Sequence, residues 1–257
     1  MDEFKKVALE AVKKAEERIL FYFKKQLEIE KKDNLTPVTK ADKEAEEVII
    51  DTIRKKFPSH GFLGEEFGGD NQKAEHIWII DPIDGTKNFI HGIDFFGTVL
   101  GLKHEEKVIL GVSNMPAIGE LLFASTEEKA TLNDKPTSVS KVERLEECFV
   151  TCSIGNLQDE RFLKAFREIS TRVVNMRGYG DTHGYHLVAT GRADVMFEGG
   201  PKPWDISAYQ IIIKQAGGKY SDFYGDEFAL GPTSLATNGI LHGQMLKIFR
   251  ETYGQAQ

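Results

Sequence analysis

Residues 78–89, WIIDPIDGTKNF, end an apolar run in two acids, Asp81 and Asp84, that flank Pro82. Proline fixes φ and lacks an N–H, so this stiff step can aim the Ile83 carbonyl and the Asp84 carboxylate toward Asp81. Two carboxylates this close repel each other unless a cation neutralises them. Oxygen-only ligands favour a hard ion, Mg²⁺ before Zn²⁺. The segment therefore predicts a metal site, the alternative for Asp81 being a plain turn residue.

The two residues that follow favour an anion beside the metal. Gly85 can adopt conformations denied to other residues and lets a ligand approach the backbone. Thr86 is expected to begin a short helix, and free N–H groups at a helix start favour an anion such as phosphate. One short loop thus combines cation ligands with an anion-binding backbone.

Three further segments carry carboxylates that could complete the site. Glu65 and Glu66 lie in the glycine-flanked stretch GFLGEEF, Asp205 follows Trp204 at a predicted helix start, and Asp42 lies in the first turn of another helix. Each has a structural alternative: a solvated acidic loop for the Glu pair, a helix N-cap for Asp205, and compensation of the helix dipole for Asp42.

The motifs GEE, DPIDGTKNF and PWDISAYQIIIKQAGG, in this order and spacing, resemble the inositol monophosphatase family of Mg²⁺-dependent phosphatases. The resemblance extends from the first predicted helix to the last. It implies an α+β fold built as a layered αβαβα sandwich. It also implies a homodimer that cleaves small phosphate monoesters, binds two to three Mg²⁺ ions per active site and is often inhibited by Li⁺.

The resemblance assigns metal ligands residue by residue. Glu65, Asp81 and the Ile83 carbonyl resemble the ligands of the first metal. Asp81, Asp84 and Asp205 resemble those of the second, and Glu65 also touches a third, weaker ion in this family.

The same resemblance assigns the catalytic and phosphate-binding groups. Gly85 and Thr86 resemble the phosphate-binding amides, and Asp42 with the Thr86 hydroxyl resembles the pair that orients the attacking water, with Glu65 as the third catalytic residue. The chemistry agrees, because metals lower the pKa of bound water and neutralise the phosphoryl oxygens. The sequence has no GxSxG motif or Cys–His signature of a covalent route, so direct attack by water without a phospho-enzyme is expected.

Substrate choice is expected to reside in the second half of the chain. Glu198 lies seven residues before Asp205, where a family Glu grips a substrate hydroxyl; the alternative is a solvated strand end. Asp181 follows Gly180, where inositol-cleaving members tend to carry small residues, and this pattern resembles the histidinol-phosphatase branch. A carboxylate in a desolvated pocket recognises an ammonium or imidazolium by a charge-assisted hydrogen bond. The alternative is that Asp181 caps a helix.

L-Histidinol phosphate is therefore the favoured substrate, ahead of inositol 1-phosphate. Fructose 1,6-bisphosphate and 3′-phosphoadenosine phosphate rank lower, because only Arg177, Arg192 and Lys202 offer cations near the specificity segment. An inert regulatory binding protein ranks last, because no metal-binding acid is missing.

Periodicity predicts the elements that must position these residues. Apolar residues at helical spacing predict helices over 3–27 and 41–56, joined by a polar connector. A buried strand at 76–80 and strands at 95–104, 107–115 and 119–126 predict an antiparallel meander. Strands and helices then alternate, with strands at 147–153, 171–176, 193–198 and 234–238 and helices at 159–170, 182–192, 205–218 and 241–253.

A boundary is placed near residue 140. Residues 1–140 form a helix pair plus an antiparallel sheet that carries most metal ligands. Residues 141–257 form an α/β half that carries Asp205 and the residues of substrate specificity.

Composition excludes several classes of protein. The 257 residues have a net charge of −7, which repels phosphate backbones and argues against nucleic acid as a general partner. No apolar run approaches the ~18 residues of a membrane span, and the charged N-terminus is no signal peptide, so a cytoplasmic protein is expected. Cys148 and Cys152 are expected to be reduced core thiols, and His183 and His186 to be packing or surface residues.

Overall fold

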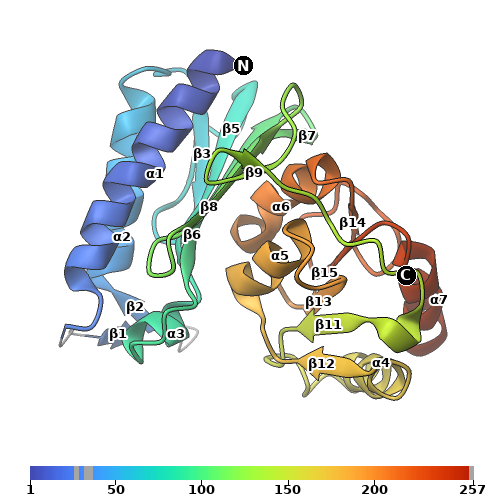
Figure 1. Cartoon of the computed structure of the whole chain (residues 1–257). Helices are drawn as coiled ribbons and strands as arrows, with labels where there is room; N and C mark the ends of the chain where they lie inside the picture. Colours follow the sequence, from blue (N-terminus) through green and yellow to red (C-terminus); the bar gives the residue numbers. More distant parts are fainter. Residues whose placement is uncertain (26–28, 32–36, 255–257) are drawn as a thin grey trace.

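The structure is a computed structural model that describes residues 1–25, 29–31 and 37–254, with only the backbone described at 29–31 and 37–39. Helices and sheets alternate in layers (Figure 1): α1 and α2, the larger sheet, α5 and α6, the smaller sheet, then α4 and α7. The predicted αβαβα arrangement is confirmed. A separate apolar core fills the space on each side of the two sheets.

The outer helix pair consists of α1 (Asp2–Tyr22) and α2 (Lys40–Arg54). The predicted apolar stripe is buried against the larger sheet. The first helix ends earlier than the expected residue 27, because Phe23 leaves the helical conformation with a ψ of 136°; residues 26 and 27 lie outside the described chain. The expected connector contains a strand pair, β1 (Ile29–Lys31) and β2 (Pro37–Thr39), while residues 32–36 lie outside what is described.

The larger sheet contains the predicted meander, with β5, β6, β7 and β8 paired antiparallel in sequence order. Residues 61–64, for which no strand was predicted, form a strand parallel to β5. In spatial order the sheet consists of β10 (Lys135–Pro136), β9 (Thr131–Leu132), β8 (Glu120–Ser125), β7 (Lys107–Met115), β6 (Gly97–His104), β5 (His76–Asp84), β3 (Gly61–Gly64) and β4 (Gly68–Asp70).

The smaller sheet is mixed: β11 is parallel to both of its neighbours, and β15 is antiparallel to both of its own. Its spatial order is β12 (Asn175–Arg177), β11 (Phe149–Cys152), β13 (Val195–Gly199), β15 (Thr233–Thr237) and β14 (Lys219–Ser221). The remaining helices are α3 (Thr86–Ile90), η1 (Leu145–Glu147, 3₁₀), α4 (Glu160–Ser170), α5 (Asp181–Ala189), α6 (Pro203–Gln215) and α7 (His242–Thr252). The predicted alternation of strands and helices is present, and β14 is an addition that the sequence analysis missed.

Two glycines allow α6 to lie directly on the larger sheet. Gly101 and Gly111 face each other on β6 and β7. A Cβ at these positions would lie 2.6 Å from Ser207 Oγ and 2.5 Å from the Ala208 carbonyl oxygen, respectively. The backbone of α6 therefore packs directly against β6 and β7, in the space that side chains at these two positions would fill. This close approach sets the distance of Asp205 from the sheet.

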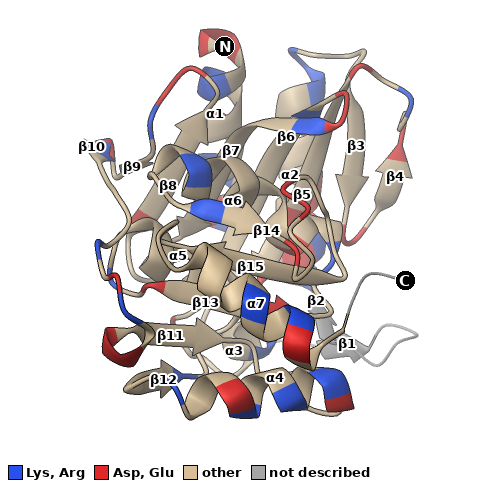
Figure 2. Cartoon of the chain, turned by 90° about the vertical axis from the view of Figure 1, so that its right-hand side faces the viewer, with Lys and Arg blue, Asp and Glu red and all other residues tan. Residues whose placement is uncertain are grey.

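The outermost helices α4 and α7 carry both acidic and basic residues (Figure 2). Behind them, Cys148 and Cys152 are buried and unpaired, and burial raises the pKa of each thiol to about 12. Both cysteines are thus core residues, as predicted. Among the described residues, no helix combines the length and apolar character needed to cross a bilayer.

The glycine pair gives a test of helix–sheet packing. We expect Gly111→Ala to lower the free energy of unfolding by about 1–3 kcal/mol, the usual cost of overpacking a core, as measured by urea denaturation. Gly243→Ala in α7 is the matched control, because no atom of residues 1–25 or 37–254 lies within 4 Å of the added methyl group and alanine favours a helix. Equal stability of the two variants would contradict the close packing of α6.

Candidate active site

A bulge in β5 brings Asp81 and Asp84 to one face of the sheet. The strand does not end at Asp81 but continues to Asp84, with Asp81 opposite Val99 and Asp84 opposite Gly97. Three residue steps along β5 are thus paired with two along β6. Side chains alternate between the faces of a regular strand, so residues three apart would lie on opposite faces; the bulge instead places both acids on the same face. Pro82 lies in this irregularity.

Asp205 joins these acids from the first turn of α6. Its carboxylate offers an oxygen within 4.8 Å of oxygens of Asp81 and Asp84. Asp205 is not the N-cap, which is Lys202, so the structural alternative for this residue was wrong in detail. Instead, the Lys202 N–H donates to Asp205 Oδ2 at 2.8 Å, which fixes the orientation of the carboxylate.

Asp81 is the electrostatic centre of the cluster. Burial raises the pKa of Asp81 well above its usual value, and the charges of Glu65, Asp84, Asp205 and Asp42 raise it further. All of these sequence-predicted acids therefore lie close enough to interact. Burial also raises the pKa of Asp205, to about 7.

Asp84 links the acids to the second half of the chain. Burial raises its pKa, and the charges of Asp181, Asp205 and Glu198 add to the effect. Asp81 Oδ1 and Glu198 Oε2 are buried without a hydrogen-bond partner among the described residues. Since buried polar atoms are almost always paired, these oxygens and the crowded negative charge fit a hard divalent cation.

Glu46, which the sequence analysis missed, holds the segment that carries Glu65. This buried glutamate of α2 accepts hydrogen bonds from the N–H groups of Glu66 at 2.9 Å and Phe67 at 3.0 Å. Burial raises its pKa to about 7. A usable signal was present: Glu46 follows Asp42 by one helical turn, so two acids lie on a buried helix face.

The Thr86 hydroxyl lies near Asp42, its expected partner, and also contacts the Ile83 carbonyl. It donates to the Ile83 carbonyl oxygen at 3.0 Å and lies 3.5 Å from Asp42 Oδ1. Gly85 precedes α3 with a φ of +85°, and a Cβ there would lie 3.0 Å from the Phe95 carbonyl oxygen. Both the positive φ and the close approach of Phe95 therefore require glycine at this position.

Asp181 lines a cleft of about 350 Å³ next to the acids. It begins α5 with a φ of +53°, and the cap position belongs to Gly180, so Asp181 does not cap the helix. Burial raises its pKa against the opposing charge of Lys87. The cleft also contains His183, whose ring stacks on Phe95 at 4.1 Å.

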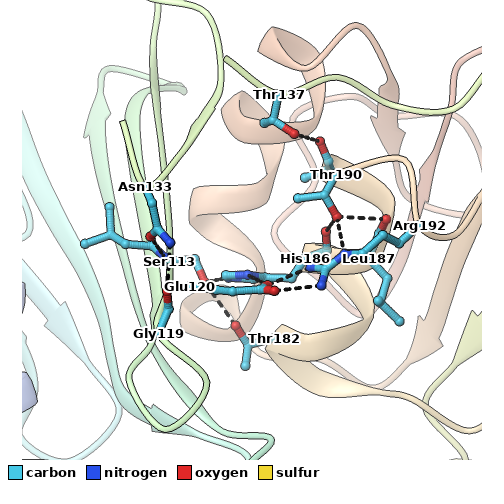
Figure 3. Close-up of polar contacts among 12 residues, drawn as sticks. Ser113, Gly119, Glu120, Asn133, Thr137, Thr182, His186, Leu187, Thr190 and Arg192 are labelled. Carbon is cyan, nitrogen blue, oxygen red and sulfur yellow. Dashed lines mark hydrogen bonds and ion pairs between the residues drawn. The ribbon is translucent and has the colours of Figure 1, made fainter. Parts of the chain in front are cut away.

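A buried polar network that includes Ser113, Thr182 and His186 (Figure 3) is linked to Asp84 through Thr182. The Thr182 N–H donates to Asp84 Oδ2, and the Thr182 hydroxyl lies 3.0 Å from Ser113 Oγ. Ser113 Oγ is also 2.8 Å from His186 Nε2 and 2.7 Å from the Tyr209 hydroxyl. His186 is thus a packing residue, as expected, but it packs within a network.

The network reaches the surface through a carboxylate. Glu120 Oε2 lies 3.4 Å from His186 Nδ1, and Arg192 donates to both Glu120 oxygens at 2.6 Å. Burial opposes ionisation, but hydrogen bonds from His186 and Arg192 lower the pKa of Glu120 to about 2. Nothing in the sequence pattern indicated this network, because its members are spread over β7, β8, α5 and α6.

Comparison with known proteins gives one consistent family. The profile of the inositol monophosphatase family matches residues 1–253. A histidinol-phosphatase of Chlorobaculum parvum is 37% identical over 242 residues, covering 93% of each chain. Inositol monophosphatase 2 of Solanum lycopersicum is 37% identical over 267 residues, covering 98% of this chain and 100% of its own. The solved structure of an IMPase from Thermotoga maritima superposes with a TM-score of 0.87 and 32% identity, covering 98% of both chains.

The acid cluster predicts an unusual pH dependence of stability without metal. The folded-state pKa of Asp205 is raised from its usual 3.8 to about 7, and those of Asp81 and Asp84 shift in the same direction. An acid whose pKa is raised by folding makes its full contribution to stability below its unfolded-state pKa. This contribution is lost as the pH rises through the folded-state pKa. In EDTA, the free energy of unfolding should therefore decline from pH 3.8 toward pH 7.

Urea denaturation over this pH range, with and without a divalent cation, measures the effect. A divalent cation binds the ionised acids and should restore stability at the upper end of the range. Asp205→Asn should flatten the decline. A stability in EDTA that rises throughout this range in both proteins would contradict the assignment.

The network behind Asp84 predicts the effect of removing one hydroxyl. Ser113→Ala leaves buried polar atoms of His186, Thr182 and Tyr209 with one partner fewer, which should cost about 1–3 kcal/mol of stability. Ser59→Ala on an exposed loop is the control. Equal urea midpoints for the two variants would show that the network contributes nothing to stability.

Proposed function

The chain belongs to the inositol monophosphatase family, whose members hydrolyse phosphoric monoesters, and from this premise we propose that it is a Mg²⁺-dependent phosphatase whose preferred substrate is L-histidinol phosphate. One observation carries the metal part of the proposal. Oxygens of Asp81, Asp84 and Asp205, from elements far apart in the chain, lie within 4.8 Å of one another.

The proposed ligands follow the motif positions. Glu65, Asp81 and the Ile83 carbonyl hold one Mg²⁺, while Asp81, Asp84 and Asp205 hold a second, and Glu65 also contacts a third, weaker ion. Two features support a hard cation: every donor is an oxygen, and Asp81 Oδ1 is buried without a partner among the described residues.

Asp42 and Thr86 are proposed to position the attacking water. When bound, Mg²⁺ acidifies water and neutralises charge on the phosphoryl oxygens. The Thr86 hydroxyl donates its proton to the Ile83 carbonyl, so its oxygen lone pairs remain available to accept a hydrogen bond from water. The Asp42 carboxylate lies beside it and accepts the second hydrogen bond, while Glu65 adds negative charge next to the nucleophile.

The phosphate group is proposed to lie against the Gly85 and Thr86 amides, at the start of α3, where free N–H groups favour an anion. The reaction is then a single in-line displacement by water, without a phospho-enzyme. The state of the thiols supports this, since burial raises the pKa of Cys148 and Cys152 to about 12 and keeps both out of nucleophilic chemistry.

Asp181 carries the choice of histidinol phosphate. Its half-buried carboxylate shares a cleft with the rings of Phe95, Tyr179 and His183. A carboxylate attracts the ammonium or imidazolium of the substrate, and aromatic faces attract cations and stack on planar rings. The only described cation lining this cleft is Lys87, which does not favour a second phosphate group on the substrate.

Inositol 1-phosphate is the second candidate. The Solanum relative named for this activity is as similar to the chain as the histidinol-phosphatase is. Glu198 is buried on β13, and its Oε2 has no hydrogen-bond partner within the described part of the chain, so it could accept a hydrogen bond from a ring hydroxyl. A side-by-side assay of both esters separates the candidates.

Three further proposals rest mainly on the family resemblance. They are a homodimer, inhibition by Li⁺, and a division of labour in which residues 1–140 supply most metal ligands while 141–257 supply Asp205 and the specificity residues.

Asp84→Asn tests the metal assignment. The substitution removes one ligand charge and little volume, and asparagine can still accept the Thr182 N–H. Loss of a residue that only hydrogen-bonds to a metal ligand typically lowers activity roughly 10–100-fold. We expect the rate of phosphate release with Mg²⁺ to fall by more than this in Asp84→Asn, with an unchanged circular dichroism spectrum. Asp159→Asn, which keeps the N-cap of α4, is the matched control. Full activity of Asp84→Asn would refute the assignment.

Asp181→Asn tests substrate recognition, since asparagine also tolerates a positive φ. Loss of a charge-assisted hydrogen bond, worth about 1.5–3 kcal/mol, should lower kcat/KM for histidinol phosphate by roughly 10–100-fold. The value for inositol 1-phosphate should change much less. An equal loss for both esters would contradict cation recognition by Asp181.

A further inference from the structure

A second group of potential metal ligands lies at the opposite end of β5 from the active site. His76 begins β5 and His104 ends β6, and the two residues are direct partners in the antiparallel ladder. Glu75 precedes His76, and its Oε1 lies 3.0 Å from His104 Nε2. One ligand atom from each of these residues lies within 4.8 Å of the other two.

We propose that Glu75, His76 and His104 form a binding site for a divalent transition-metal ion, Zn²⁺ in the first place, that is separate from the catalytic acids. Two imidazoles and one carboxylate are a donor set that suits Zn²⁺ and not Mg²⁺. Ligand atoms about 2.1 Å from a tetrahedral zinc are about 3.4 Å apart, so small side-chain rotations suffice.

The separation from the active site follows from the strand itself. His76 and Asp84 are the two ends of β5, which has nine residues, so about 26 Å of extended chain divides them at about 3.3 Å per residue. In Figure 1 the start of β5 lies near the N-terminus, whereas α3, which follows the other end of β5, lies at the opposite end of the strands.

The surroundings hold His76 in place and favour its neutral, metal-binding form. Its ring stacks between His104 at 4.6 Å and His60 at 4.9 Å, and Phe4 of α1 lies 5.3 Å away. Burial and the neighbouring His104 lower the pKa of His76. The carboxylate is ionised, since the hydrogen bond from His104 lowers the pKa of Glu75.

His60 supports the site without being a ligand. The Trp78 indole N–H donates to His60 Nδ1 at 3.0 Å, so neutral His60 carries its proton on Nε2 and has no free lone pair for a metal. Glu75 and His104 are open to solvent, with side chains 74% and 35% exposed, which gives an ion a path to enter. A bound ion would join the ends of β5 and β6 and stabilise the corner of the sheet on which α1 begins.

Zn²⁺ titration of the untagged protein tests the proposal. A chromophoric chelator competes for Zn²⁺ in the presence of millimolar Mg²⁺, which occupies the catalytic acids. We expect one tight Zn²⁺ site in the wild type and in Asp84→Asn. His104→Gln and Glu75→Gln should weaken Zn²⁺ binding by at least about 10-fold, while His91→Gln, at an exposed histidine outside the group, should not.

Imidazole proton NMR gives a second readout that does not depend on the variants. One equivalent of Zn²⁺ should shift or broaden the ring signals of His76 and His104 and leave that of His91 unchanged. Tight binding that Asp84→Asn abolishes and His104→Gln leaves intact would overturn the proposal, as would unperturbed His76 and His104 signals at one equivalent. Failure of this site leaves the phosphatase assignment untouched.

Discussion

Repulsion among buried carboxylates is the constraint on which the site depends. Asp81 lies in a desolvated position with the charges of Glu65, Asp84, Asp205 and Asp42 around it. Such a group of acids either binds protons or binds a cation, and near neutral pH a divalent cation satisfies it best. The metal requirement of a phosphatase of this family thus follows from the fold itself, because the chain concentrates negative charge where little water reaches it.

Backbone features, more than side-chain contacts, create this concentration. The bulge at Pro82 turns Asp84 to the same face as Asp81, and the paired glycines Gly101 and Gly111 let α6 bring Asp205 down onto that face. Both features involve residues that carry no catalytic group. The site is therefore sensitive to substitutions whose only effect is on backbone geometry or packing.

Much of this was predictable from sequence, for identifiable reasons. Helical and alternating periodicity located most helices and the meander, and the resemblance of the acidic motifs to the inositol monophosphatase family indicated which carboxylates belong together. The irregular parts were harder: β3 and β14 are too short for periodicity to show. The network through Ser113 and His186 arises from tertiary packing of elements far apart in the chain. Glu46 is buried beside the segment that carries Glu65. The only sign of this in the sequence was the position of an acid on an apolar helix face.

The most direct test of the proposed metal site is a crystal structure of the protein grown with Mn²⁺ as a substitute for Mg²⁺, with ions located by anomalous scattering. We expect an anomalous peak bonded to oxygens of Asp81, Asp84 and Asp205, and a second peak beside Glu65 and the Ile83 carbonyl. Mn²⁺ found only elsewhere, with the buried acids hydrogen-bonded to one another, would contradict it.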